Sequence, residues 1–254
     1  GTIFALASDP LLRLILHVIQ GWLFAFADDL ALSLCNLAEQ LKKVHAVIDQ
    51  GLEDIEALVA ELFDPVEIPL IELVHETHGN NSFETEQAIN EYLAQLPNAP
   101  VMNLKEILLQ GKVTPRRGPA LMSVIGKTTL DPGYLEIMLA REQIRQSGLS
   151  AMVDAQLDAL IYATFDHQTT LIPPDALTNP DPGDRYGWGN NRRLSPVTGF
   201  PAITVPAGFT EDDLPVGIEL LGRAFSEGML LRLAYAYEQA TQRRRPPVTT
   251  PPLE

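Results

Sequence analysis

Apolar and polar positions predict helices through most of the first two thirds of the chain. Apolar residues recur at spacings of three and four between Asp29 and Leu62, which is the period of a helix with one buried face. A second helix is expected from Asn81, where Glu84 completes a capping-box pair. Pro97 ends this second pattern, because proline cannot continue a helix.

Two further helices are indicated by their caps rather than by their periodicity. Asn103 is expected to cap a short helix over residues 104–110. A longer helix is expected to run to about Gln146, with Asp131 as its N-cap and Pro132 at its first position. Gly148 follows it closely, so the pattern predicts that this helix is interrupted or ends there.

The last part of the chain predicts strands and a final helix. Gly199 and Pro201 stop a helix, and short apolar runs rich in β-branched residues flank a polar turn at 210–213. An amphipathic helix follows over residues 227–243, with Ser226 as its expected cap. The predicted fold class is therefore α/β, a mixed β-sheet covered by helices, with strands near 66–68, 158–164, 202–206 and 215–222.

Composition and charge narrow the class of protein. The chain has 254 residues and a formal net charge of −15, which argues against nucleic acid as a partner because that partner needs a basic surface. Its single cysteine, Cys35, cannot form an internal disulfide. A cytoplasmic location is therefore expected.

The two ends of the chain differ from the middle. Residues 1–36 form an apolar segment of unclear origin, in which 11–27 is shorter than the roughly 20 residues that a membrane span needs. We interpret it as a buried or partner-covered helix and expect no membrane span. A membrane-associating segment and a sequence foreign to the parent fold are the alternatives. One partial domain is expected over 37–245, followed by a proline-rich tail at 246–254.

Asp166 and His167 are the candidate site residues. They directly follow the clearest predicted strand, and ligands bind at strand ends in α/β sheets. Imidazole titrates near neutrality, so His167 could position or protonate a substrate. A histidine that is simply hydrogen-bonded within a loop is the alternative interpretation.

Other candidate residues are weaker. His75 and His78 are three apart instead of the four of the zinc-protease helix, and no third ligand is evident, so no metal site is predicted. Cys35 lies in an apolar region and is interpreted as a core residue. Ser195 precedes a proline at an expected helix and is interpreted as a cap or packing residue.

Three consecutive segments between Leu194 and Glu238 carry a specific pattern. They read Gly-Phe-Pro-Ala-Ile-Thr-Val-Pro-Ala-Gly-Phe, then Leu-Pro-Val-Gly-Ile-Glu-Leu-Leu-Gly-Arg, then a helix start Glu-Gly-x-Leu-Leu. In this order they resemble the C-terminal end of amidase-signature hydrolases. A weaker similarity covers about residues 44–245.

The resemblance implies the C-terminal half of an amidase-signature fold and a parent enzyme that hydrolyses carboxylic amides without a cofactor. Family members use a Ser–cis-Ser–Lys triad from a glycine- and serine-rich loop and an upstream lysine. This sequence has no Gly-Gly-Ser-Ser-Gly run, so no catalytic residue is assigned and the chain alone is expected to be inactive. The strand 157–164 resembles one that leads into the wall of the family's substrate channel.

The partners implied are a small-molecule amide in the complete enzyme and either a missing N-terminal half or a second copy of the chain. Two other functions stay open. One is a non-catalytic amidase-like scaffold or subunit. The other is the transamidating subunit of a tRNA-dependent amidotransferase, which the acidic charge and the short tail disfavour.

Overall fold

The computed structural model describes residues 27–58, 60–77, 81–115, 117–165, 167–169, 174–175, 178 and 191–247. These residues form two compact units. The first contains the described residues within 1–69, 147–169 and 189–254, and the second contains those within 70–146 and 170–188. The division into an N-terminal segment, one partial domain and a tail remains a prediction.

The first unit is built around a three-stranded antiparallel sheet. Its strands are β1 (Ala159–Ala163), β2 (Ala202–Phe209) and β3 (Pro215–Gly222), in the order β1-β3-β2. The α/β class is therefore confirmed for the described residues, but the sheet that they form is antiparallel rather than mixed. The strand expected at 66–68 is reduced to an isolated bridge at Glu67.

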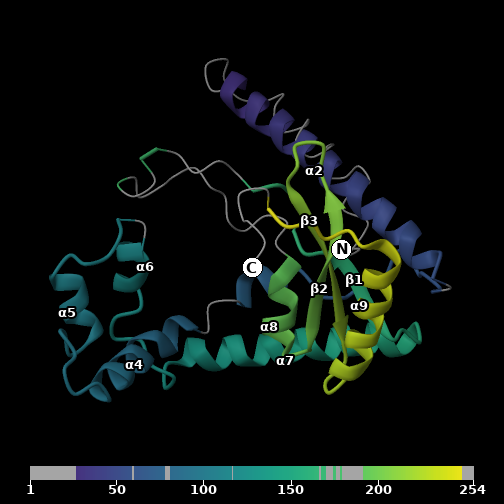
Figure 1. Ribbon diagram of the computed structural model, residues 1–254. Coiled ribbons are helices and arrows are strands. Elements are labelled where there is room, and N and C mark those ends of the chain that lie inside the picture. Colours follow the sequence, from purple (N-terminus) through teal and green to yellow (C-terminus); the bar gives the residue numbers. More distant parts are fainter. Residues whose placement is uncertain are drawn as a thin grey trace. The chain divides into compact units, whose positions relative to one another are not determined.

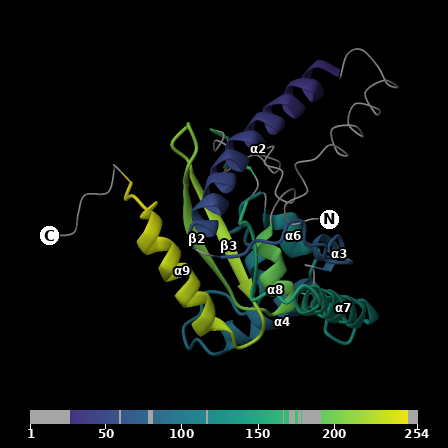
Figure 2. The ribbon, with the colours of Figure 1, turned by 90° about the vertical axis from the view of Figure 1, so that its right-hand side faces the viewer.

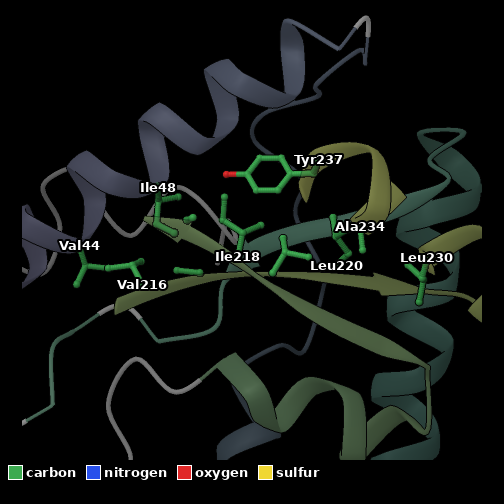
Figure 3. Packing of buried hydrophobic residues seen from close by; sticks show 11 residues of the cluster. Val44, Ile48, Val216, Ile218, Leu220, Leu230, Ala234 and Tyr237 are labelled. Atoms are coloured by element: carbon green, nitrogen blue, oxygen red, sulfur yellow. The ribbon is translucent and has the colours of Figure 1, made fainter. Parts of the chain in front are cut away.

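Two helices cover one face of this sheet. Helix α2 (Ala27–Glu56) crosses it, and helix α9 (Glu227–Thr241) packs beside α2, as Figures 1 and 2 show. Figure 3 shows the core between them, where Val44 and Ile48 from α2 meet the inward side chains of β3. Ile218 lies at the centre and is 0% exposed. The alternation of strand β3 places its even-numbered residues on this apolar face.

A short helix lies on the opposite face. The 3-10 turn η3 (Asn191–Arg193) leads into α8 (Leu194–Thr198), which lies across the sheet from α9 (Figures 1 and 2). Gly199 ends α8 in the left-handed conformation at φ 71°, as the sequence predicts.

The β2–β3 hairpin is longer than predicted. The first strand was expected near 202–206, but β2 continues to Phe209 through a β-bulge between Pro206 and Gly208. The bulge accommodates Pro206 because an extra residue locally interrupts the ladder. The predicted turn at 210–213 is present, with Thr210 donating its backbone N–H to the carbonyl oxygen of Leu214 at 2.9 Å.

The second unit is helical. Its elements are α3 (Leu73–Glu76), α4 (Asn81–Ala94), α5 (Leu104–Leu109), α6 (Arg117–Met122) and the first part of α7 (Pro132–Asp154). Asn103 caps α5 as predicted, accepting the backbone N–H of Glu106 at 3.0 Å. Tyr134 of α7 donates to the carboxylate of Glu84 in α4 at 2.8 Å.

The expected interruption near Gly148 is wrong. Helix α7 continues through this glycine to Asp154. A Cβ at Gly148 would lie 3.7 Å from the ring of Phe200, which is an ordinary van der Waals distance, so the packing around α7 does not itself require a glycine here. A helix of 23 residues tolerates the penalty of about 1 kcal/mol that a single glycine carries relative to alanine.

Candidate functional site

A row of polar side chains crosses the sheet on the face away from α2 and α9. Glu219, at the middle of β3, stands directly opposite Tyr162 of β1 and Thr204 of β2 in the strand register. Since side chains alternate along a strand, these residues lie on the face opposite Ile218. Tyr162 and Glu219 are buried, with 1% and 5% of their surfaces exposed, whereas Thr204 is exposed.

Hydrogen bonds join this row into a chain. The Tyr162 hydroxyl donates to Glu219 Oε1 at 2.8 Å, and Thr204 Oγ1 donates to Glu219 Oε2 at 3.3 Å. Thr164 Oγ1 in turn lies 3.3 Å from Thr204 Oγ1. The bond from Tyr162 has the usual length for a hydroxyl donor and the two threonine bonds are longer, so the buried end of the chain is the stronger one.

The number of protons fixes the direction of this hydrogen-bond chain. A carboxylate only accepts, and each hydroxyl has one proton. Tyr162 and Thr204 therefore both donate to Glu219, and Thr164 donates to Thr204. The Thr164 oxygen, at the outer end, then offers only lone pairs and is suited to an N–H or O–H donor.

Gly217 makes the meeting of the two threonines possible. A Cβ at this position would come 2.6 Å from Thr204 Cγ2 and 3.2 Å from Thr164 Oγ1. The first distance is far below van der Waals contact, so any side chain here would push the threonines apart. The glycine of β3 thus leaves the space in which Thr164 and Thr204 form their hydrogen bond.

The surroundings of Tyr162 raise the pKa of its hydroxyl far above the usual value of about 10. Burial is the larger cause, because it disfavours the phenolate, and the negative charge of Glu219 adds to it. Tyr162 therefore remains a neutral donor to Glu219 throughout the physiological range.

The segment after β1 extends the polar character of this region. Asn191 of η3 donates its amide to the carbonyl oxygen of Ala163 at 2.8 Å. Gln168, which is buried, donates to Thr210 Oγ1 at 2.5 Å. Amide and hydroxyl groups therefore lie around the end of β1 in the first unit.

The structure places one of the two predicted site residues. His167 is half-buried, and its ring makes an edge-on contact with Phe165 at 6.1 Å between centroids. Asp166 lies outside the described residues. A substrate-contacting role for this pair remains a prediction.

The sequence interpretation overlooked the hydrogen-bonded chain itself. Its residues stand inside runs that read as plain buried strands. The available signal was a charged residue in Gly-Ile-Glu-Leu-Leu and a tyrosine in Leu-Ile-Tyr-Ala, since buried carboxylates need hydrogen-bond partners.

The other singled-out residues show packing contacts or remain undescribed. Ser195 Oγ donates to the carbonyl oxygen of Phe200 at 2.8 Å, which holds the turn after α8. Cys35 lies in α2, and His78 lies outside the described residues. Within the described ranges no cluster of three metal-binding side chains occurs, and no helix is long and apolar enough to cross a membrane.

The family model named Amidase matches residues 42–231. This match contains the C-terminal half of α2, the whole sheet and the hydrogen-bonded row. The chain belongs to the amidase-signature family. The solved structure of native peptide amidase from Stenotrophomonas maltophilia aligns over 80% of this chain with a TM-score of 0.64 and 25% identity, and this chain covers 40% of it.

Sequence relatives point to the same amidase-signature family. A glutamyl-tRNA(Gln) amidotransferase subunit from Synechococcus sp. (strain JA-3-3Ab) is 45% identical over 127 residues, which are 49% of this chain and 23% of that protein. An Arabidopsis thaliana protein named as a probable amidase is 23% identical over 220 residues, covering 81% of this chain and 38% of its own. The amidase-signature chain described here thus spans well under half the length of the curated relatives that it matches.

Proposed function

We propose that this chain is the C-terminal portion of an amidase that hydrolyses carboxylic amides through a Ser–cis-Ser–Lys mechanism, with the catalytic residues outside it. One observation carries the proposal. The family match covers 42–231, yet the sequence has no Gly-Gly-Ser-Ser-Gly run that could supply the nucleophile.

In this proposal the first unit supplies scaffold and one wall of the substrate channel. An amide substrate has N–H donors as well as a carbonyl acceptor. The acceptor oxygen of Thr164 suits an amide N–H, and His167 stands three residues further along the chain. The wall binds and orients, while the bond-breaking groups come from elsewhere.

The test is an assay of the purified 254-residue chain with 4-nitroacetanilide. No release of 4-nitroaniline is expected. Turnover that disappears in Cys35→Ala, His167→Ala or Ser195→Ala would overturn the proposal, because the chain would then carry its own catalytic group.

The leading alternative is a non-catalytic amidase-like scaffold or subunit, and size-exclusion chromatography separates it from a truncated enzyme. An oligomerising chain with exposed apolar surface is expected for a truncated enzyme. A monodisperse monomer favours an independent scaffold. The coding sequence upstream of Gly1 gives a second test, since a Gly-Gly-Ser-Ser-Gly loop after a lysine is expected there.

A further candidate is the transamidating subunit of a tRNA-dependent amidotransferase. The identity of 45% to a glutamyl-tRNA(Gln) amidotransferase subunit favours it. The net charge of −15 opposes it, because a tRNA partner needs a basic surface. Filter retention of glutamyl-tRNA(Gln) by the chain is the discriminating measurement, and no retention is expected.

A further inference from the structure

The segment after strand β1 carries His167 directly beside a buried polar residue. The backbone N–H of Thr164 still donates to the carbonyl oxygen of Gly217 at 3.0 Å, which closes the end of β1. Gln168 lies beyond this bond, outside the strand, yet only 8% of it is exposed. Buried polar side chains in proteins are nearly always hydrogen-bonded. The partners of Gln168 therefore show what fixes the chain next to His167.

Gln168 is bonded to the turn between β2 and β3. Its amide donates to Thr210 Oγ1 at 2.5 Å. The Lys43 ammonium lowers the pKa of the Asp212 carboxyl in the same turn, and a hydrogen bond from Gln168 lowers this pKa further. A buried amide that lost its acceptors would keep the cost of its desolvation, so these bonds favour one position of the segment.

Thr210 is itself fixed at the start of this turn and is 4% exposed. Its backbone N–H donates to the carbonyl oxygen of Leu214 at 2.9 Å, and its Oγ1 accepts the backbone N–H of Leu214 at 3.3 Å. The carbonyl oxygen of Thr210 accepts the backbone N–H of Asp213 at 2.9 Å. The position of the Thr210 hydroxyl is therefore set by the hairpin and not by the segment that carries His167.

Ion pairs connect the turn to two helical regions of the first unit. Lys43 of α2 contacts Asp212 at 2.7 Å and Glu211 at 3.3 Å. Arg245, which follows α9, contacts Asp213 at 2.6 Å. Figures 1 and 2 show the β2–β3 hairpin beside α2. One exposed pair contributes little to stability, but together these pairs hold the turn against the elements that form the core.

We propose that the β2–β3 turn positions His167, with Thr210 as the positioning residue that acts through Gln168. The turn is distant from His167 in sequence, and the buried bond between Gln168 and Thr210 links the two. The inference rests on the proposed function only for its purpose, which is to hold the His167 imidazole at the end of β1 for contact with an amide. The position of the imidazole can be measured without any substrate, so positioning and substrate contact are tested separately.

The experiment follows the imidazole proton signals of His167 by NMR in the 254-residue chain, assigned with His167→Gln. The ring current of Phe165 shifts these signals, because the two rings make an edge-on contact at 6.1 Å between centroids. Phe165→Leu gives their position without this ring. Thr210→Val removes the acceptor and nearly keeps the shape, so the signals are expected to move toward their position in Phe165→Leu. Thr210→Ser keeps a hydroxyl and should restore the parent signals.

Two further variants separate positioning from a purely structural role. Gln168→Met removes the donor and leaves the turn bonds of Thr210 intact, so it should displace the signals even if Thr210→Val fails to fold. Thr241→Val is the control, since it removes a hydroxyl bonded to the carbonyl oxygen of Tyr237 in α9, and it should leave the His167 signals in place. Parent-like His167 signals in either folded Thr210→Val or Gln168→Met would overturn the proposal, whatever the loss of stability.

Titration of the parent chain with phenylacetamide tests the proposed function separately. Movement of the His167 signals would support contact between His167 and an amide. Signals that stay in place would count against this contact, while the comparison of Thr210→Val with Thr210→Ser would still decide whether the turn positions His167.

Discussion

The two faces of strand β3 are both buried, but one is apolar and the other is polar and hydrogen-bonded. Val216, Ile218 and Leu220 face α2 and α9 and are all buried in an apolar core. Glu219, between them in sequence, is also buried but faces away and needs Tyr162 and Thr204 as donors. The first face is stabilised by area removed from water, and the second only as long as its hydrogen bonds stay complete.

The apolar face is expected to be the more sensitive to truncation. Ile218→Ala should lower the free energy of unfolding by about 3–4 kcal/mol, since a fully buried side chain leaves a cavity. Urea denaturation followed by circular dichroism measures it. Leu231→Ala is a matched control, because Leu231 is exposed on α9. A similar loss in both variants would contradict the contrast between core and surface.

The polar face is expected to respond to loss of a single hydroxyl. Tyr162→Phe keeps the ring and removes the shortest bond to Glu219, which should cost about 2 kcal/mol. Combining it with Glu219→Gln, in a double-mutant cycle by urea denaturation, isolates the pair. An additive cycle would mean that the two side chains do not interact.

Alkaline pH should weaken the polar face selectively. The pKa of Tyr162 is raised by burial and by Glu219, so the folded chain keeps its phenolic proton where the unfolded chain loses it. Its stabilising contribution is complete below about pH 10 and is lost above it, at up to about 1.4 kcal/mol per pH unit.

The pH dependence of urea denaturation between about pH 8 and pH 11 measures this effect. Tyr162→Phe should flatten the curve. Tyr237→Phe is the comparison on the apolar face, because burial also raises the pKa of Tyr237. An unchanged slope in Tyr162→Phe would remove Tyr162 as the cause.

The outer end of the polar chain should matter least for stability. Thr204→Val preserves shape and removes a hydroxyl whose two hydrogen bonds are both 3.3 Å long. The expected loss is about 0.5 kcal/mol, at the low end for a hydrogen bond. Thr241→Val tests a local hydroxyl bond in α9 for comparison. A loss equal to that of Tyr162→Phe would show that the outer bonds are as strong as the inner one.

Much of the fold of the first unit follows from local sequence. Gly199, the turn at 210–213 and the strand at 215–222 each have a clear local signal, and all three are present. The continuation of α7 through Gly148 was missed, because a single glycine weakens a helix without necessarily ending it. The β-bulge between Pro206 and Gly208 was missed as well, because it depends on the pairing of β2 with β3.

The sequence pointed to His167 as a candidate site residue but not to the hydrogen-bonded row through Glu219. The strand end led to the choice of His167, whose role in substrate contact stays a prediction, and the structure adds the hydrogen bonds of Gln168 and Asn191 nearby. The row through Glu219 depends on the register of three strands, and pairing between β1 and β3 is not encoded in either strand alone. The direction of the hydrogen bonds in this row can be worked out only when these contacts are known.

The strand order has a consequence for how the protein folds. Strands β2 and β3 are joined by a short turn, but β1 reaches β3 only after a connection of about fifty residues. Local pairing costs less chain entropy than closing so long a loop, so the hairpin can form first and β1 joins afterwards. Substitutions in the turn should then slow folding, whereas those in β1 should mainly speed unfolding.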